Sequence, residues 1–214
     1  MWRIALFFVI GAVIGLGLME YMKSQELAGG VIEMPKDDKA EATGMSLGVP
    51  EIGGEFVLLN EQGETVTQDD FKTHYKLIFF GFTFCPAVCP TELGRMAKIM
   101  EALGDDARKV QPLFITIDPE RDTPEVIKEY VPQFHPRLVG LTGSVEQIDA
   151  VKESFKVYAS KTENEMMDGY MMDHSSFMYF TSPDNQLLKL FSTKDEVGFI
   201  AESVGSIIGR SGQE

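Results

Sequence analysis

The apolar run Leu77-Ile78-Phe79-Phe80-Gly81-Phe82 leads through Thr83 and Phe84 into Cys85-Pro86-Ala87-Val88-Cys89-Pro90, and the rest of the chain is organised around this stretch. Apolar residues without alternation predict a strand buried on both faces, as in the middle of a parallel or mixed sheet. From Thr91 to Gly104 the apolar residues recur at helical spacing, so a helix follows. The only two cysteines of the chain therefore lie between the end of a strand and the start of a helix.

Three interpretations of Cys85 and Cys89 are open. Either proline beside them could begin the helix, and in both cases the helix dipole favours thiolate over thiol. A disulfide staple would enclose only three residues, so it would remove little entropy from the unfolded chain. A thiol redox centre suits two reactive thiols, although the usual spacing of two intervening residues is absent. A metal site would suit Cu(I) or zinc, but it needs a further ligand.

Residues 1–23 are predicted to form a membrane anchor. The segment Ile4–Met19 is uncharged and almost wholly apolar, with Trp2 and Tyr21 near its ends and Arg3 before it. Its length is close to the lower limit for a membrane-spanning helix, so a signal peptide is the competing interpretation. The weak cleavage signal favours an uncleaved anchor. A positive charge ahead of the helix predicts that the remainder lies outside the cytoplasm.

The remaining chain divides into a tether, one domain and a short tail. Residues 24–48 are rich in Gly, Pro and charged residues and lack a sustained period, which predicts a flexible tether. Residues 49–210 suffice for one domain with a substantial core, and residues 211–214 form the tail. The net charge of −14 argues against a nucleic-acid partner, because phosphate backbones require clustered Lys and Arg. Two cysteines make no disulfide framework for an exported domain, so the pair is expected to serve chemistry.

Strands and helices alternate along the domain. A hairpin with a glycine-containing turn is expected over 56–66, before the thiol stretch. The apolar strand 110–117 follows the thiol helix, which implies a parallel pair with a right-handed crossover. The segment 162–173, which is polar and rich in methionine, is expected to be a loop. The later elements are helices at 123–133, 144–155 and 197–208, a short strand at 137–141 and a hairpin at 177–191. This order predicts an α/β thioredoxin-like fold, in which helices flank a central mixed sheet.

A third metal ligand would come from one of the three histidines. His74 precedes the buried strand, at the rim opposite the thiols, and is expected to have a surface role. His135 follows a helix and is expected to be a partner of the helix dipole or to have no role. His174 closes the methionine-rich segment directly before a strand. A lone histidine is more often structural than a ligand. However, copper bound by two thiolates needs one more soft or borderline donor, and imidazole suits copper.

Four short motifs occur in order along the domain. They are Gly81–Pro90 with its C-P-x-x-C-P pattern, Ile117–Thr123 with the pattern I-D-P-x-R-D-T, Val139–Gly143 and Asp173–Ser175. Together they resemble the motifs of the SCO (SenC) copper chaperones of cytochrome c oxidase assembly. The resemblance implies a thioredoxin-like fold behind a single membrane anchor. It also implies that copper, as Cu(I) and Cu(II), is held by Cys85, Cys89 and His174.

The resemblance further implies partners and location. Copper would pass to the binuclear copper site of an oxidase subunit, with another periplasmic copper carrier as a candidate source. The protein would then be a metallochaperone rather than an enzyme, and the alternative is a thiol-disulfide reductase or redox sensor that acts on the copper-site cysteines of the oxidase. Such proteins face the bacterial periplasm or the mitochondrial intermembrane space. An Arg- and Ser-rich transit peptide is absent, which favours the bacterial inner membrane.

Two features near the expected site have less specific interpretations. Asp118 and Asp122 follow a strand that ends at the same rim as the thiols, so they are expected to support the ligands or to contact a partner. Capping of the loop is the ordinary alternative for both. For the methionine-rich segment, adaptable packing is favoured over thioether contacts with Cu(I).

Overall fold

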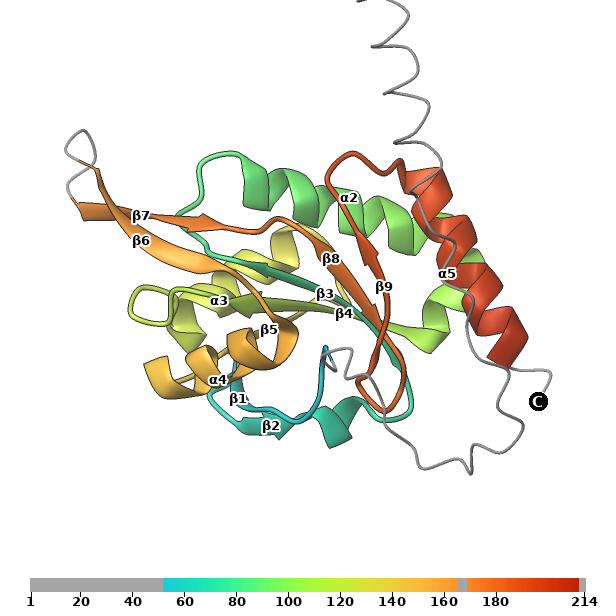
Figure 1. The fold of residues 1–214 in the computed structure, drawn as a ribbon, viewed down its shortest axis with the longest axis horizontal. Coiled ribbons are helices and arrows are strands. Elements are labelled where there is room, and N and C mark those ends of the chain that lie inside the picture. The colour runs from blue at the N-terminus through green and yellow to red at the C-terminus, as the bar shows by residue number, and fades with distance from the viewer. Residues whose placement is uncertain (1–51, 165–168, 212–214) are drawn as a thin grey trace, which may run out of the picture. The chain divides into compact units, whose positions relative to one another are not determined.

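The apolar run forms strand β3 (Tyr75–Gly81) in the interior of a seven-stranded sheet. Every residue from Lys76 to Gly81 is buried, as expected for a strand that is covered on both faces. The computed structural model describes residues 52–164 and 169–211 (Figure 1). The expected anchor and tether, residues 1–48, lie outside these ranges. Within them, no helix combines the length and apolar character that crossing a bilayer requires.

The predicted central mixed sheet is confirmed. Its strand order is β2-β1-β5-β4-β3-β8-β9. Strands β3, β4 and β5 are parallel, while the hairpins β1–β2 and β8–β9 and the pairs β1–β5 and β3–β8 are antiparallel. The bounds are β1 Val57–Asn60, β2 Thr65–Thr67, β4 Val110–Thr116, β5 Val139–Thr142, β8 Met178–Thr181 and β9 Leu187–Phe191. Because β3 and β4 run parallel, the loops that follow them meet at one edge of the sheet.

Helices lie on both sides of the sheet, as predicted (Figure 1). Helix α2 (Val88–Ala102) packs beside α5 (Val197–Ser211), while α3 (Pro124–Tyr130) contacts β5 and α4 (Val145–Phe155) contacts β1. Short 3-10 helices occupy Gln68–Phe71 (η1), Gly104–Lys109 (η2) and Val131–Gln133 (η3). The helix predicted at 144–155 is confirmed as α4, and a capping box begins it, because the side chains of Ser144 and Gln147 accept each other's backbone N–H.

The prediction of a loop over residues 162–173 is wrong. Strands β6 (Ala159–Asn164) and β7 (Gly169–His174) form a two-stranded hairpin that is separate from the main sheet. A two-stranded ribbon is marginal in water, so its stability must come from packing against the domain. Met172 is buried in the core, and Tyr170 and Met171 pack against it. The polar residues around these three concealed the contacts, because the segment shows no sustained apolar alternation.

Candidate metal centre

The two cysteines lie at the junction of β3 and α2. Cys85 is half-buried in the connecting loop, while Cys89 is fully buried in the first turn of α2. The helix begins at Val88, between the two prolines, rather than at either of them. As predicted, both sulfurs therefore lie at the positive end of the helix. The backbone N–H of Cys89 donates to Cys85 Sγ over 3.3 Å.

The thiol pair shares a proton unequally. A hydrogen bond from the Cys89 side chain is the main reason that the pKa of Cys85 is lowered to about 5. Nearby backbone N–H groups lower it further, while partial burial opposes the shift. The same hydrogen bond and burial raise the pKa of Cys89. At neutral pH the pair therefore holds one proton, which lies on the buried Cys89. Cys85 is the thiolate of the pair, and it lines a cavity beside the helix start.

A glycine makes room for the buried sulfur. Gly81 is the last residue of β3, and a Cβ atom there would lie 2.9 Å from Cys89 Sγ and 2.8 Å from Phe79 Cε1. Any larger residue would push the sulfur or the ring out of place. The strand end and the first turn of α2 can approach this closely only because position 81 has no side chain.

His174 reaches the thiols from β7. Its Nε2 lies 3.7 Å from Cys89 Sγ, and its Nδ1 lies 3.0 Å from the backbone oxygen of Ser175. Because a carbonyl oxygen only accepts, we assign the ring hydrogen to Nδ1, which leaves the Nε2 lone pair free to bind a metal. The imidazole lies edge-on to the rings of Phe79 and Phe82, with centroid distances of 6.2 and 5.8 Å.

The separation of Cys89 and His174 fits two ligands of one ion. Metal–sulfur and metal–nitrogen bonds of about 2.3 and 2.0 Å, at trigonal or tetrahedral angles, place sulfur and nitrogen roughly 3.5–3.7 Å apart. A cavity of about 240 Å³ opens beside these groups. Its walls include Phe82, Cys85, Pro86, Ala87, Val88, Met171, Met172, Asp173, His174 and Ser176. Among the described residues, no three or more His, Cys, Asp or Glu side chains are already grouped as a complete metal site.

The other two histidines lie elsewhere. His74 directly precedes β3, at the end opposite the thiols, and its Nδ1 is 2.9 Å from Thr73 Oγ1. His135 Nδ1 accepts the backbone N–H of Arg137 over 3.1 Å. Of the three histidines, the structure therefore brings only His174 to the cysteine pair.

Asp122 supports the loop that carries Cys85. Its fully buried carboxylate accepts the backbone N–H and the hydroxyl of Thr83, over 3.0 and 2.5 Å, and the hydroxyl of Thr116, over 2.6 Å. Burial is the main cause of its raised pKa, which these hydrogen bonds partly offset. The side chain thus ties the thiol loop to the end of β4. The sequence did not indicate either threonine as a partner.

Asp118 connects the β4–α3 loop to the β6–β7 hairpin. Its carboxylate is buried and accepts Arg121 Nε over 2.5 Å and the hydroxyl of Tyr170 over 2.6 Å. Sequence reasoning assigned no role to Arg121 or Tyr170. Tyr170 precedes His174 by four positions and so shares its face of β7, but the prediction of a loop over residues 162–173 hid this relation.

Known proteins are similar in sequence to this chain over most of its length. Residues 45–209 match the family model described as SCO1/SenC. The chain is 40% identical over 202 residues to Protein SCO1 homolog 1, mitochondrial, of Arabidopsis thaliana, covering 92% of this chain and 59% of that protein. It is 39% identical over 189 residues to the SCO2-like protein of Rickettsia felis, covering 88% of this chain and 89% of that protein.

Two solved structures are similar to the fold described above. Arabidopsis thaliana ScoI with copper bound has a TM-score of 0.71 and 39% identity, covering 74% of this chain and 99% of that chain. Bradyrhizobium japonicum ScoI with copper bound has a TM-score of 0.67 and 39% identity, covering 72% of this chain and 98% of that chain.

Proposed function

This chain belongs to the SCO1/SenC family, and from that premise we propose that it binds copper and delivers it to the binuclear copper site of cytochrome c oxidase during assembly. The observation that carries the proposal is the 3.7 Å approach of His174 Nε2 to Cys89 Sγ, next to the Cys85 thiolate. Two similar solved proteins, each 39% identical to this chain, have copper bound.

The proposed ligands are Cys85, Cys89 and His174. Two thiolates suit Cu(I), and an added imidazole nitrogen lets the same site hold Cu(II). Copper is cargo here, so the protein must bind it firmly and still release it. Cys85 is already a thiolate at neutral pH, whereas Cys89 must lose its proton when copper enters. The buried sulfur therefore couples copper binding to proton release.

The proposed location is the bacterial inner membrane, with the domain on the side away from the cytoplasm. Residues 1–23 would anchor the chain, and residues 49–210 would face the bacterial periplasm, with the mitochondrial intermembrane space as the alternative. Relatives of both kinds occur, since the matches include mitochondrial proteins and Rickettsia proteins. The proposed partners are the copper-site subunit of the oxidase, as acceptor, and another periplasmic copper carrier, as donor.

The test is copper stoichiometry followed by transfer. The full chain, reduced and loaded under anaerobic conditions, should hold one copper ion, and Cys85→Ala or Cys89→Ala should abolish binding because too few soft donors remain. Oxidation of the pair to a disulfide should also block binding. His135→Ala is the matched control and should bind normally. Unchanged copper affinity in either cysteine variant would contradict the proposal.

The second arm separates copper delivery from thiol reduction. The loaded chain is mixed with the soluble copper-site domain of the oxidase, and both the copper and the disulfide of the acceptor are followed. Delivery predicts that copper appears on an acceptor that was already reduced. Reduction of the acceptor disulfide without copper transfer would favour the alternative role as a thiol-disulfide reductase.

A further inference from the structure

The hairpin that carries His174 is held to the domain by side chains. Strands β6 and β7 pair only with each other and share no ladder with the seven-stranded sheet. The distance between His174 and the thiols therefore depends on what fixes β7 in place. Successive side chains of a strand alternate between its faces, so Tyr170, Met172 and His174 share one face of β7.

Tyr170 is bound at its hydroxyl, its ring and its backbone. Its hydroxyl donates to Asp118 Oδ1 over 2.6 Å, and its backbone oxygen accepts Arg121 Nη1 over 3.0 Å. Arg121 Cζ lies 3.9 Å from the centroid of the Tyr170 ring, and Arg121 Nε donates to Asp118 Oδ2 over 2.5 Å. Asp118 is only 1% exposed, so these charge-assisted bonds are shielded from water.

Arg121 also touches the loop that carries Cys85. Its Cζ lies 4.8 Å from the centroid of Phe84 and 5.9 Å from that of Phe82. One guanidinium thus contacts both sides of the site, namely the loop before Cys85 and the strand that ends at His174. Asp118 fixes this guanidinium in the β4–α3 loop. Arg121 therefore joins the β4–α3 loop to the two elements that line the cavity, the loop that carries Cys85 and strand β7.

We propose that Asp118, Arg121 and Tyr170 form a clamp that positions His174 against the thiols and so controls how readily the histidine leaves copper. The inference rests on the proposed function, which it deepens. The three residues act as positioning residues and not as ligands. With the clamp closed, His174 Nε2 lies 3.7 Å from Cys89 Sγ and can complete the site. With the clamp open, the two thiolates retain Cu(I) while the histidine is free, which is the state from which copper can pass to an acceptor.

The test begins with the metal-free full chain, so that it does not depend on copper. The centroid of the His174 ring lies 6.2 Å from that of Phe79 and 5.8 Å from that of Phe82, so ring currents should shift the NMR signals of its C–H protons. His174→Asn identifies these signals among those of three histidines. Tyr170→Phe removes one hydroxyl and keeps the ring, and Arg121→Lys keeps the charge and removes the planar fork. Both variants should move the His174 signals toward the values of a free imidazole.

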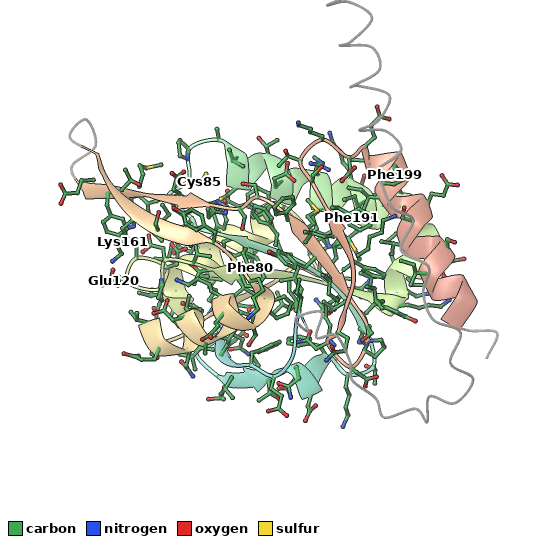
Figure 2. The ribbon with its side chains drawn as sticks, viewed as in Figure 1. Phe80, Cys85, Glu120, Lys161, Phe191 and Phe199 are labelled. Carbon is green, nitrogen blue, oxygen red and sulfur yellow. The ribbon has the colours of Figure 1, made fainter. Side chains whose placement is uncertain are left out.

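Hydrogen exchange on β7 provides a second readout. Tyr170→Phe removes a hydrogen bond to a charged group, so it should speed exchange of the β7 amides by about tenfold or more. The matched control is Tyr158→Phe, which also removes one tyrosine hydroxyl; this hydroxyl lies 3.0 Å from Ser160 Oγ, at the start of the same hairpin. The ion pair of Glu120 and Lys161 (Figure 2) is less suitable, because Lys161 Nζ lies 4.6 Å from the centroid of the Tyr170 ring. Tyr158 is 63% exposed, so the Tyr158→Phe variant should leave the His174 signals and the exchange of the β7 amides unchanged.

Copper loading completes the experiment. Tyr170→Phe should bind Cu(I) with the stoichiometry of the unmodified chain but lose Cu(II) faster. His174 signals and β7 exchange that remain unchanged in both Tyr170→Phe and Arg121→Lys would overturn the clamp. The proposed ligand set alone would be overturned if His174→Asn kept the Cu(II) spectrum while Tyr170→Phe and Arg121→Lys still moved the His174 signals of the metal-free chain.

Discussion

At the scale of the residue, Cys85 is a thiol that should already be ionised well below neutral pH. Its pKa is lowered to about 5, chiefly by the hydrogen bond from Cys89, whose own pKa is raised by the same bond. The thiolate is the reactive form, so alkylation of the metal-free chain by iodoacetamide should rise as pH increases through about 5 and then level off. Mass spectrometry should find the label on Cys85 before Cys89.

A variant isolates the cause of this behaviour. Cys89→Ala removes the donor to Cys85, so the pKa of Cys85 should rise toward its ordinary value and the alkylation profile should move to higher pH. Preferential labelling of Cys89 in the unmodified chain, or an unchanged profile in Cys89→Ala, would show that the thiols do not share a proton in this way.

His174 should decide which oxidation state of copper the site can hold. His174→Ala should retain Cu(I) on the two thiolates but lose stable Cu(II), because Cu(II) requires added nitrogen. The loss should appear in the thiolate-to-copper charge-transfer absorption and in the paramagnetic signal. His74→Ala and His135→Ala are the controls, since both side chains lie away from the thiols. Loss of the Cu(II) signal in a control but not in His174→Ala would refute the ligand assignment.

Gly81 should be as sensitive as a ligand, although it binds nothing. In Gly81→Ala the new methyl group would lie 2.9 Å from Cys89 Sγ, so the sulfur or β3 must shift. Overpacking of a core costs about 1–3 kcal/mol, and the displaced sulfur should also weaken Cu(I) affinity in a competition assay. In Gly94→Ala, within α2, the new methyl group meets nothing within 4 Å, so stability should rise by roughly 0.5–1 kcal/mol. Equal copper affinity in both variants would contradict this account.

At the scale of the element, Arg95 fastens α2 to the segment before α5. It donates to the backbone oxygens of Ser192, Thr193 and Asp195 and pairs with Glu92, whose side chain is 5% exposed. Arg95→Ala would leave the Glu92 carboxylate buried and unpaired, which typically costs about 3–5 kcal/mol. Urea denaturation should therefore show a much lower midpoint with an unchanged slope.

An exposed ion pair of the same spacing is the control for Arg95. Arg108 pairs with Asp105 over 3.0 Å, and their side chains are 78% and 95% exposed. Arg108→Ala should therefore change the free energy of unfolding by less than about 1 kcal/mol. Similar losses in Arg95→Ala and Arg108→Ala would mean that burial of Glu92 and the three backbone bonds contribute little.

At the scale of the whole molecule, the anchor and the domain should be separable. Deleting residues 1–23 should move the chain from the membrane fraction to the soluble fraction, because the uncharged segment Ile4–Met19 is then missing. Copper stoichiometry and the unfolding midpoint should not change, since the proposed ligands all lie within residues 52–174. Membrane fractionation and copper analysis check both statements. A full chain whose mature N-terminus lies beyond residue 23 would instead indicate a cleaved signal peptide.

The local pattern of the chain was enough to predict most of the fold. The unbroken apolar run predicted β3, the helical spacing of apolar residues predicted α2, and the alternation of elements predicted helices on both sides of a mixed sheet. These features depend on residues within one turn or one strand of each other, so periodicity reveals them. The position of the cysteines at the helix start was likewise readable, although the start at Val88 was not.

The assembly of the site depends on contacts between distant parts of the chain. Cys89 and His174 are 85 positions apart, and their approach depends on the β6–β7 hairpin, which the polar composition of residues 162–173 concealed. Arg121 and Tyr170 gained their roles in the same way, because they meet across 49 positions through contacts that no local period records. The four sequence motifs indicated the ligands through their resemblance to a known family. Long-range packing determines which side chains can reach one ion and what holds them there.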